Sequence, residues 1–388
     1  MSIRSADRLG GRAAIVGIGA TEFSKDSGRS ELTLAVEAVR AALDDAGLTP
    51  ADVDGMVTFT MDTSPEITVA QAAGIGELSF FSRIHYGGGA ACATVQQAAL
   101  AVAAGVADVV VCYRAFNERS GRRFGSGVQQ REPSAEGAAL GWQLPFGLLT
   151  PASWVAMIAQ RYLHTYGLTP EVFGHVAVTD RRHAARNPAA YFHGKPITLA
   201  DHAASRWIVE PLRLLDCCQE TDGGQAIVVT SVERARDLRR PPAVIVGAAQ
   251  GAGRNQEAMT SFYRDELTGL PEMGVVAGQL WRSAGLAPRD IDVAILYDHF
   301  TPFVLMQLEE FGFCGRGEAA DFVAADALPL NTHGGQLGEA YLHGMNGIAE
   351  AVRQVRGTSV NQIPGASRTL VTAGTGVPTS GLVLGADD

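Results

Sequence analysis

The sequence contains few cysteines, and they lack the spacing that holds a metal ion or a disulfide framework. Their number is odd, no CxxC or Cys/His ligand pattern occurs, and most of them have apolar neighbours. The five are Cys92, Cys112, Cys217, Cys218 and Cys314. We therefore expect reduced thiols in the core and no metal centre.

An excess of positive charge and a long apolar run are also missing. A formal net charge of -10 and a pI near 5.4 argue against a nucleic-acid or anionic-membrane surface, because either would need basic residues to neutralise phosphate. The N-terminal MSIRSADRLGGRAAIVGIGATEF has no sustained apolar segment, and no uninterrupted apolar run reaches the roughly 18 residues of a membrane span. We expect a cytoplasmic protein with no nucleic-acid and no membrane partner.

An internal repeat organises what the sequence does contain. With 46% hydrophobic and 19% charged residues, the chain of 388 residues is long enough for two core-forming halves. A strand at 13–19 and a helix at 31–46 lead into AGLTPADVDGMVTFT, and a strand at 243–248 and a helix at 274–284 lead into AGLAPRDIDVAILYD. The first of these turns enters a strand at 56–60. The two segments match almost position for position.

A second pair of segments agrees with this repeat. GGGAACATVQQAALAVAAGVADVVVCYRA predicts a glycine-rich loop, a helix and a strand, and so does GEAYLHGMNGIAEAVRQVRG with the strand at 369–373. Fully apolar strands such as VVVC indicate buried sheets covered by helices, hence an α/β fold with duplicated halves. We place the N-terminal half at 1–115, a covering and loop region that returns to this half at 116–238, and the C-terminal half at 239–388.

The stretch NTHGGQLGEAYLHGMNG, at 331–347, is rich in glycine and precedes an amphipathic run at 348–355. Glycine permits positive φ and a close approach of a ligand, and the free N–H groups of the following helix can hold an oxyanion. Such a loop suits thioester chemistry. A turn whose His and Tyr only satisfy their own hydrogen bonds explains the loop equally well.

Arginines gather in the segment RAFNERSGRRFGSG, within the covering region. They are Arg114, Arg119, Arg122 and Arg123. Guanidinium groups suit phosphate, so this segment is a candidate phosphate contact, with a solvated charged loop as the alternative. Further along, the Asp-Gly-Gly sequence at 222–224 predicts a turn into a strand at 226–229.

Several long motifs resemble one family. They are HYGGGAACATVQQAA, AFNERSGRRFG, PLRLLDCCQETDGG, YDHFTPF, NTHGGQLGEAYLHGMNGIAE and LVTAGTGVPTSG. Over nearly the whole chain the sequence resembles the thiolase superfamily, in its sterol-carrier thiolase-like branch of lipid-transfer proteins. Within that branch it resembles the actinobacterial steroid side-chain-cleaving aldolases. The resemblance implies a thiolase-like αβαβα arrangement of the duplicated halves.

The same resemblance implies that the catalytic positions of a true thiolase have changed. The position of the nucleophilic cysteine falls on Gly88, and Cys92 lies about one turn further into the helix. Tyr341 replaces the histidine of the thiolase GHP motif, and Tyr297 takes the place of the Asn- or His-containing motif. The C-terminal cysteine loop corresponds to TAGTG at 372–376, which has no thiol. No covalent acyl-enzyme is expected.

A retro-aldol cleavage needs no thiolate. It needs a group that takes the proton of a β-hydroxyl, donors for a thioester enolate, and an acid for the leaving carbon. We hypothesise that Tyr297 takes the hydroxyl proton and Tyr341 protonates the enolate, and the reverse order stays open. Since a phenol has a pKa near 10, it acts as a donor more readily than as a base. A tyrosine base would need a donor or a positive charge from His299 or His343.

The remaining candidate site residues surround these tyrosines in the sequence. Asp298 orients His299 or caps the next helix. The supporting residues are Asp298, His299 and His343, the oxyanion-loop glycines are Gly88, Gly89, Gly374 and Gly376, and the candidate contacts of CoA phosphates are Arg119, Arg122 and Arg123.

The resemblance also implies the substrate and the partners. The substrate is a steroid acyl-CoA, 17-hydroxy-3-oxo-pregnene-20-carboxyl-CoA, which is cleaved to a 17-keto steroid and propionyl-CoA without a metal or redox cofactor. From the resemblance to this branch we expect a homodimer. We also expect it to bind an OB-fold partner domain of the preceding hydratase, which would give a heterotetramer. Two other functions remain open from the sequence, namely a thiolase that uses Cys92 and a non-catalytic sterol or acyl-CoA carrier.

Overall fold

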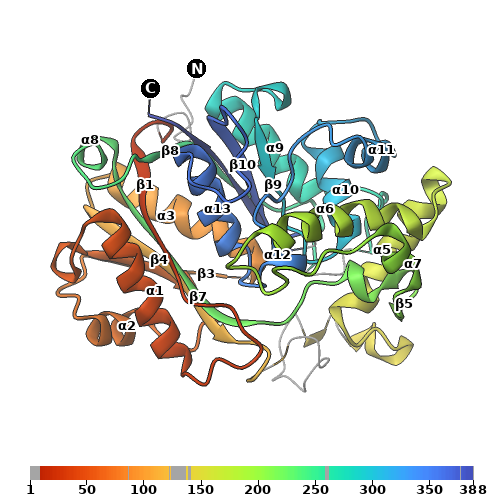
Figure 1. The fold of residues 1–388 in the computed structure, drawn as a ribbon, viewed down its shortest axis with the longest axis horizontal. Coiled ribbons are helices and arrows are strands. Elements are labelled where there is room, and N and C mark those ends of the chain that lie inside the picture. The colour runs from red at the N-terminus through yellow and green to blue at the C-terminus, as the bar shows by residue number, and fades with distance from the viewer. Residues whose placement is uncertain are drawn as a thin grey trace.

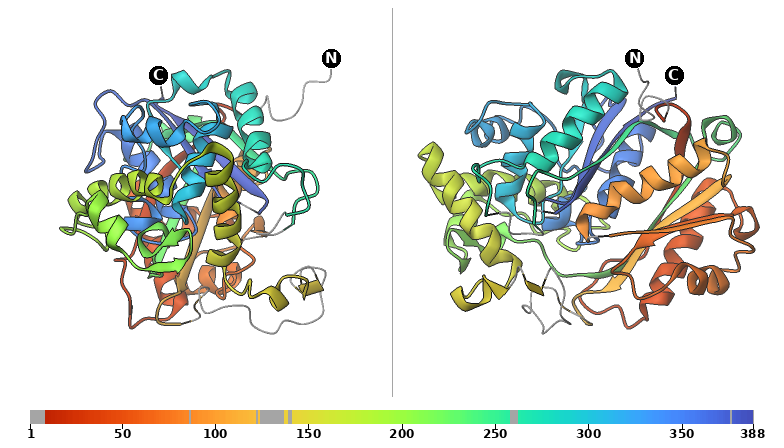
Figure 2. Two further views of the ribbon diagram at one scale, coloured as in Figure 1. Left: turned by 90° about the vertical axis from the view of Figure 1, so that its right-hand side faces the viewer. Right: turned by 180° about the vertical axis from the view of Figure 1, so that it is seen from behind.

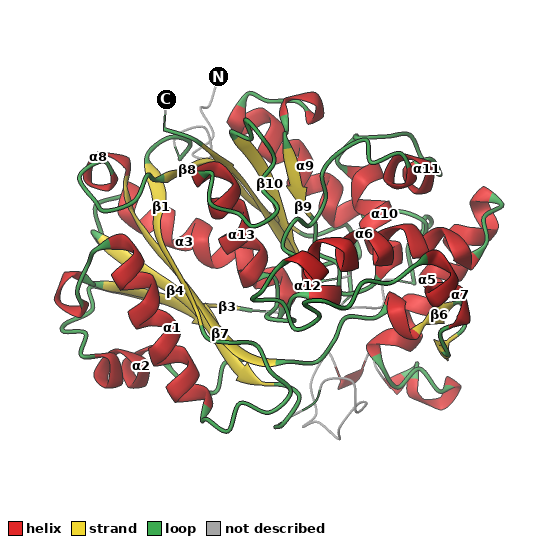
Figure 3. Ribbon diagram, viewed as in Figure 1, coloured by secondary structure: helices red, strands yellow, loops and turns green. Residues whose placement is uncertain are grey.

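Nine strands form one mixed β-sheet, in the order β3-β2-β4-β7-β1-β8-β11-β10-β9 (Figure 3). The computed structural model describes residues 9–85, 87–121, 123, 137–138, 141–257, 262–375 and 377–387. The strands of this sheet are β1 (Ala13–Ala20), β2 (Gly55–Phe59), β3 (Phe80–Ile84), β4 (Val109–Asn117), β7 (Asp222–Ser231), β8 (Ala243–Gly251), β9 (Val293–Ile295), β10 (Arg368–Ala373) and β11 (Thr379–Gly385).

The order of the strands confirms the predicted duplication. In the first series β2 pairs with β4 in parallel, and β4–β7 and β7–β1 are antiparallel. In the second series β9 pairs with β10 in parallel, and β10–β11 and β11–β8 are antiparallel. The two series meet where β1 and β8 pair, at Ala14 with Val244 and at Ile15 with Ala243. Each series therefore repeats one topology, and their first strands join them.

Helices cover both outer faces of the two series and also fill the space between them. On one outer side α1 (Glu31–Ala46) and α2 (Glu66–Ala73) pack together, while α3 (Ala91–Ala103) and α13 (Met345–Arg356) contact strands of both series (Figures 1 and 2). The pleat of the strands explains this arrangement, because successive side chains point to opposite faces. In β4, Val109 and Val111 pack with the α1 core, whereas Val110 and Cys112 pack with the central helices. The result is the expected αβαβα order of layers.

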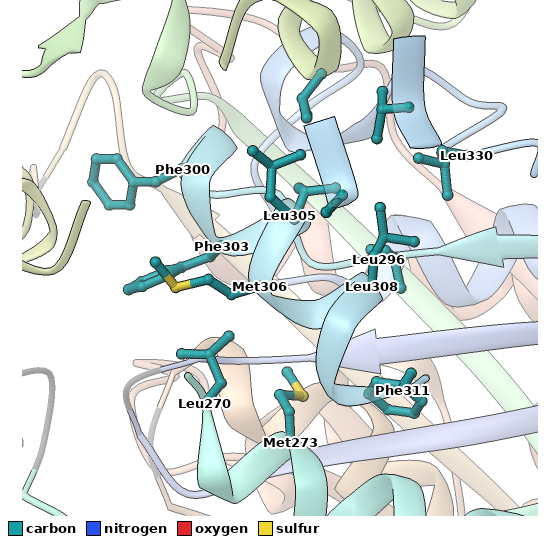
Figure 4. Packing of buried hydrophobic residues seen from close by; sticks show 14 of the residues in the cluster. Leu270, Met273, Leu296, Phe300, Phe303, Leu305, Met306, Leu308, Phe311 and Leu330 are labelled. Atoms are coloured by element: carbon teal, nitrogen blue, oxygen red, sulfur yellow. The ribbon is translucent and has the colours of Figure 1, made fainter. Parts of the chain in front are cut away.

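The outer face of the second series is covered by α9 (Pro271–Ala284) and α10 (Thr301–Glu310). Figure 4 shows Phe303 and Met306 of α10 beside Leu270 and Met273 at the start of α9. Almost every residue of α10 is buried, so packing fixes this helix, which begins six residues after the end of β9.

The helices between 151 and 204 of the predicted covering region lie on the right of Figure 1, whereas β7 at the end of this region returns to the sheet of the N-terminal half. Domain boundaries at 115 and 238 remain a prediction. Among the described residues no helix is long and apolar enough to cross a lipid bilayer. The elements of this region and the remaining short helices are α5 (Pro151–Tyr166), α6 (Phe173–Arg186), α7 (Leu199–Ala204), β5 (Trp207–Val209), β6 (Leu212–Arg213), α8 (Val232–Ala235), α11 (Ala319–Ala324) and α12 (Gly335–Gly338).

One predicted turn is wrong. The Asp-Gly-Gly sequence at 222–224 is the beginning of β7, which pairs with β4 from Asp222 opposite Asn117. Glycine stands here because a helix approaches closely. A methyl group on Gly224 would lie 2.6 Å from the carbonyl oxygen of Leu34 in α1.

Candidate active site

Tyr297 lies two residues beyond the end of β9, and its backbone is fixed from two sides. Its N–H donates to Thr372 Oγ1 of β10 at 2.9 Å, and its carbonyl accepts from Gln307 Nε2 of α10 at 2.8 Å. Thr372 Oγ1 in turn donates to Gln307 Oε1 at 2.5 Å. These bonds join β10, α10 and the backbone of Tyr297 in one network. They fix the backbone position from which the Tyr297 side chain extends.

Tyr341 reaches the same place from the glycine-rich loop. Its backbone N–H donates to Thr221 Oγ1 at 2.8 Å, just before β7 begins. Its ring packs edge-on against Phe116 and His343, with ring centroids 6.4 Å and 5.0 Å away. The hydroxyl oxygens of Tyr297 and Tyr341 are 3.4 Å apart. The two tyrosines predicted from separate motifs therefore form a pair.

Burial decides the protonation of both phenols. It raises the pKa of Tyr297 well above its ordinary value, which the hydrogen bond with Tyr341 only partly offsets. Burial also raises the pKa of Tyr341, and the neighbouring Tyr297 adds to this effect. Both side chains are therefore neutral at neutral pH and carry a proton that they can donate.

Gly88 leaves the room that Tyr297 occupies. It begins a single 3₁₀ turn, Gly88–Ala90, directly before α3. A methyl group on Gly88 would lie 1.8 Å from the hydroxyl oxygen of Tyr297. The next glycine meets the other half of the chain, since a methyl group on Gly89 would lie 1.9 Å from the carbonyl oxygen of Pro378. The space in front of Gly88 is thus filled by the phenol of Tyr297, and the equivalence of this position with that of the thiolase nucleophile remains a prediction.

Gly374 belongs to this contact between the loops. Its φ is 79°, a left-handed conformation that favours glycine, and a methyl group there would lie 2.5 Å from Gly89 Cα. Gly376 lies outside the described residues. The role of these glycines as donors to an oxyanion remains a prediction.

His343 is held as a neutral imidazole. Its Nδ1 accepts a hydrogen bond from Arg114 Nε at 3.1 Å, and its ring stacks between Phe59 and Phe116. Burial and then the charge of Arg114 lower its pKa well below the ordinary value. Since arginine is always a donor, Nδ1 is unprotonated and the proton of the ring resides on Nε2. His343 also has φ of 52°, which is uncommon outside glycine.

His299 lies beside Tyr297, with ring centroids 4.9 Å apart. Burial lowers the pKa of His299 to about 3, and Thr375 Oγ1 is 3.4 Å from its Nε2. Both histidines are thus hydrogen-bonding groups and not sources of positive charge at neutral pH. A tyrosine base in this site cannot draw its stabilisation from an imidazolium.

Asp298 supports the loop and does not orient His299. Its carboxylate accepts from the backbone N–H groups of Gln336 at 2.8 Å and Leu337 at 3.0 Å, in the single turn α12. Of the two predicted roles the structure shows capping, but of a helix within the glycine-rich loop and not of α10. Asp180 is hydrogen-bonded to Asp298, and burial raises the pKa of both carboxyls.

The arginine segment divides into different environments. Arg114 is 1% exposed and donates to Asp62 Oδ1 at 2.6 Å, so it is not part of a phosphate-binding loop. Arg119 is exposed, and Arg123 Nε donates to Glu220 Oε2 at 2.7 Å. Arg122 lies outside the described residues. Contacts of Arg119 and Arg123 with CoA phosphates remain a prediction.

Cys92 is directed away from the tyrosine pair. It is fully buried in the central core, its Sγ donates to the carbonyl of Val371 at 3.8 Å, and burial raises the pKa of the thiol. Such a thiol is inert as a nucleophile. Among the described residues, no group of three or more His, Cys, Asp or Glu side chains is arranged to bind a metal ion.

Sequence reasoning missed the positioning roles of three residues. Thr221 holds the backbone of Tyr341, Arg114 donates to His343, and Asp62 accepts from Arg114. A signal existed only for Arg114, because an arginine inside the apolar strand VVVCYRAF must be paired when that strand is buried.

Comparison with known proteins identifies the family of this fold. Residues 253–384 match the family model "Thiolase C-terminal domain-like". A "Steroid side-chain-cleaving aldolase" of Thermomonospora curvata is 70% identical, over 98% of this chain and 99% of its own length. A "17-hydroxy-3-oxo-4-pregnene-20-carboxyl-CoA lyase" of Mycobacterium tuberculosis is 68% identical, over 97% of this chain and 100% of its own length.

A solved structure shares the whole fold. The chain superposes on one chain of an "Ltp2-ChsH2(DUF35) aldolase" with a TM-score of 0.94 and 69% identity, over 98% of this chain and 99% of that one. The fold and the site define a thiolase-like enzyme without the thiolase cysteine. Within that class, the chain belongs to the family of steroid side-chain-cleaving aldolases.

Proposed function

We propose that the chain cleaves the side chain of a β-hydroxyacyl-CoA steroid by a retro-aldol reaction. The proposed substrate is 17-hydroxy-3-oxo-pregnene-20-carboxyl-CoA, and the products are a 17-keto steroid and propionyl-CoA. The names of the two relatives at 70% and 68% identity support the substrate. The observation that carries the chemistry is the pair of neutral phenols 3.4 Å apart in the space that Gly88 leaves open.

The proposed proton path runs from the substrate hydroxyl to the α-carbon. Tyr297 takes the hydroxyl proton as it passes its own proton toward Tyr341, since neither phenol is ionised at rest. The bond between the hydroxyl-bearing carbon and the α-carbon breaks, its electron pair enters the thioester enolate, and a ketone forms on the steroid. In the same relay Tyr341 gives its own proton to the enolate carbon, so that each phenol again carries one proton. The net change is the transfer of one proton from the substrate hydroxyl to the α-carbon, and the reaction as a whole involves no net oxidation or reduction.

The loops near these phenols supply the rest of the proposed site. N–H groups of the loops at Gly88, Gly89, Gly374 and Gly376 steady the oxygen of the thioester enolate. His343 adds a neutral donor through its Nε2–H, and Arg119, Arg122 and Arg123 contact the CoA phosphates. The proposal uses no redox cofactor, because a retro-aldol cleavage transfers no electrons to an acceptor. It uses no metal, because the N–H groups of the loops take the role of the Lewis acid at the enolate oxygen.

The test is removal of each phenol oxygen. Tyr297→Phe and Tyr341→Phe are each expected to lower the rate of propionyl-CoA release by about 10²- to 10⁴-fold. The matched control is Tyr113→Phe, because the buried Tyr113 hydroxyl donates to the carbonyl of Ser64 at 2.7 Å, on the α1 side of the sheet. If both active-site variants keep near-full turnover, the mechanism is wrong. If the wild type binds the CoA thioester and leaves its mass unchanged, the chain is a carrier.

We further propose that the active form is a complex in the cytoplasm. The name of the solved aldolase, "Ltp2-ChsH2(DUF35)", supports a DUF35 partner, and we infer an OB-fold domain of the preceding hydratase on a homodimer of this chain. Coexpression with that domain is expected to give a heterotetramer by light scattering and to raise the yield of active protein. A lone chain that is soluble and fully active would contradict an obligatory complex.

A further inference from the structure

The sequence contains two lysines among its 31 lysine and arginine residues, and the fold brings both to one aromatic ring. Lys25 lies in the loop between β1 and α1, and Lys195 lies between α6 and α7. Their Nζ atoms are 4.5 Å and 5.7 Å from the centroid of the Tyr191 ring, within the range of a cation–π contact. We call these three residues the lysine cluster. Its two cations are far apart in sequence, so the fold assembles the cluster.

Lys25 connects the lysine cluster to the backbone of Tyr341. Its Nζ donates to the carbonyl of Glu220. The next residue, Thr221, accepts the N–H of Tyr341 with its Oγ1 at 2.8 Å. One residue of the chain therefore separates the carbonyl that holds the Lys25 ammonium from the hydroxyl that holds Tyr341.

Tyr191 connects the cluster to the same loop from the other side. Its backbone N–H donates at 3.0 Å to the carbonyl of Glu339, two residues before Tyr341. Tyr341 is partly exposed, as are Lys25 and Tyr191, whereas Tyr297 is 4% exposed. The lysine cluster therefore lies beside the phenol of the pair that solvent reaches.

Three donors of this region have no acceptor among the described residues. Lysine carries three N–H groups, and Lys25 uses two of them, for the carbonyl of Glu220 and for Gln219 Oε1 at 3.1 Å. Because lysine can only donate, Oε1 of Gln219 faces it, and Nε2 of this 9% exposed residue remains a buried donor without a partner. Lys195 contacts the Tyr191 ring and forms no hydrogen bond or ion pair within the described part of the chain. A ligand rich in acceptors would satisfy all three.

The charges around Lys25 indicate that such a ligand is an anion. Burial, and then the charge of Arg119, lower the pKa of Lys25 to about 8, which the carboxylates of Glu220 and Glu118 only partly offset. Glu220 Oε2 accepts from Arg123 Nε at 2.7 Å. Lys25 is still mainly protonated at neutral pH, and a bound anion would oppose both the burial and the repulsion.

We propose that the lysine cluster binds a phosphate group of the CoA thioester. This inference rests on the proposed function, which places the thioester at the tyrosine pair and the phosphates at the far end of the substrate. A CoA chain that leaves the pair past Tyr341 reaches the Lys25 ammonium, which binds phosphate as a point charge. The Tyr191 ring holds both ammonium groups in place before the substrate arrives, and Gln219 Nε2 adds an uncharged donor.

The test compares two substrates of the coexpressed complex, the CoA thioester and the pantetheine thioester of the same acyl group, which lacks the phosphates. Lys25→Met is expected to raise KM for the CoA thioester about 10-fold and to leave kcat nearly unchanged, because the ground state and the transition state lose the contact alike. With the pantetheine thioester the variant and the wild type should have the same KM. Lys25→Arg should recover most of the lost affinity, because it keeps the charge. An equal rise in KM with both substrates, or no rise with either, would overturn the proposal.

A second variant keeps the proposal testable if Lys25→Met does not fold. Lys195 is exposed, so Lys195→Met should fold normally and raise KM about 3-fold, for the CoA thioester alone. The matched control is Arg289→Met, which removes one positive charge from a side chain that is 85% exposed in the C-terminal half and should leave KM unchanged. Equal KM values in Lys195→Met and Arg289→Met would contradict the proposal.

Binding of free CoA separates this proposal from the proposed function. Titration calorimetry of the complex is expected to show about 10-fold weaker CoA binding in Lys25→Met than in the wild type. A wild type that releases no propionyl-CoA would contradict the proposed function, and weaker CoA binding by Lys25→Met would still support the phosphate site. An active wild type with the same CoA affinity as Lys25→Met would contradict the phosphate site alone.

Discussion

The hydroxyl of Tyr297 occupies the space of a side chain at position 88, because a methyl group on Gly88 would lie only 1.8 Å from its oxygen. Gly344 approaches the other edge of the ring, where a methyl group would lie 3.1 Å from Cδ2. The ring is therefore enclosed by glycines of both halves. A cysteine at position 88 and a tyrosine at position 297 cannot coexist in this backbone, so the residue at one position restricts the residue at the other.

The first prediction concerns this dependence. Gly88→Ala is expected to displace the Tyr297 ring, to lower kcat by about 10²-fold or more, and to destabilise the fold by about 1–3 kcal/mol through overpacking. In a Tyr297→Ala background the same change should cost much less stability, which denaturant unfolding of the four variants measures. Gly76→Ala is the matched control, since a methyl group there meets no atom within 4 Å. Additive effects would contradict the steric exclusion.

The second prediction separates this enzyme from a cysteine-dependent thiolase. Cys92→Ala is expected to keep near-wild-type kcat, and to lower the free energy of unfolding by about 1 kcal/mol because a small cavity remains. Iodoacetamide should leave the activity of the folded enzyme intact, since the Cys92 thiol is fully buried and its pKa is raised. Loss of activity in Cys92→Ala would instead support a thiolase that uses Cys92 as its nucleophile.

The third prediction concerns the buried ion pair of Arg114 and Asp62. Both side chains are 1% exposed, and their N–O distance is 2.6 Å. Arg114→Ala leaves the Asp62 carboxylate buried without its cation, so we expect a loss of about 3–5 kcal/mol in unfolding free energy. The double variant Arg114→Met/Asp62→Asn should lose less unfolding free energy than the sum of the losses in Arg114→Met alone and Asp62→Asn alone. A double variant that loses the full sum would show that the pair is not coupled.

The fourth prediction concerns Glu339, two residues before Tyr341. Its carboxylate is fully buried and accepts from Asn187 and Asn346, and burial raises its pKa from 4.5 to about 7. Because the folded state holds this proton more tightly than the unfolded state, the stabilisation is complete below pH 4.5 and is lost as pH rises through 7. The loss is about 3 kcal/mol.

Glu339→Gln carries no ionisable proton at this position. The difference between its unfolding free energy and that of the wild type should therefore change in favour of the variant from pH 4.5 to 7 and stay constant above. Urea unfolding at several pH values measures the difference. Parallel curves for the two proteins would show that Glu339 does not titrate with a raised pKa.

Local patterns were sufficient for much of the fold. The helix at 31–46 was predicted with its observed limits, since Ser30 caps its first turn and Gly47 ends it at φ of 75°. The helix predicted at 274–284 begins three residues earlier, at Pro271, because proline is favoured in the first turn. The Asp-Gly-Gly strand start at 222–224 was mistaken for a turn, since the reason for its glycines is a helix distant in sequence.

The candidate site was likewise predicted only in part from the sequence. Tyr297 and Tyr341 followed from the resemblance of their motifs to thiolase positions, and their pairing needed the structure. The partners of Arg114 lie 52 and 229 residues away, and Thr221 is 120 residues from Tyr341. Such contacts leave no local pattern. The neutral state of His343 was also hidden, because it depends on burial and on the charge of a distant arginine.

The meeting of β1 and β8 at two residue pairs has a mechanical consequence. Gly88 and Gly89 come from the half that contains β1, whereas Tyr297, Tyr341 and Gly374 come from the half that contains β8. A substrate that touches both groups spans the boundary, and its binding free energy then opposes separation of the halves. With substrate bound, the two halves should therefore unfold together as one cooperative unit, even though β1 and β8 pair at only two residue positions among the described residues.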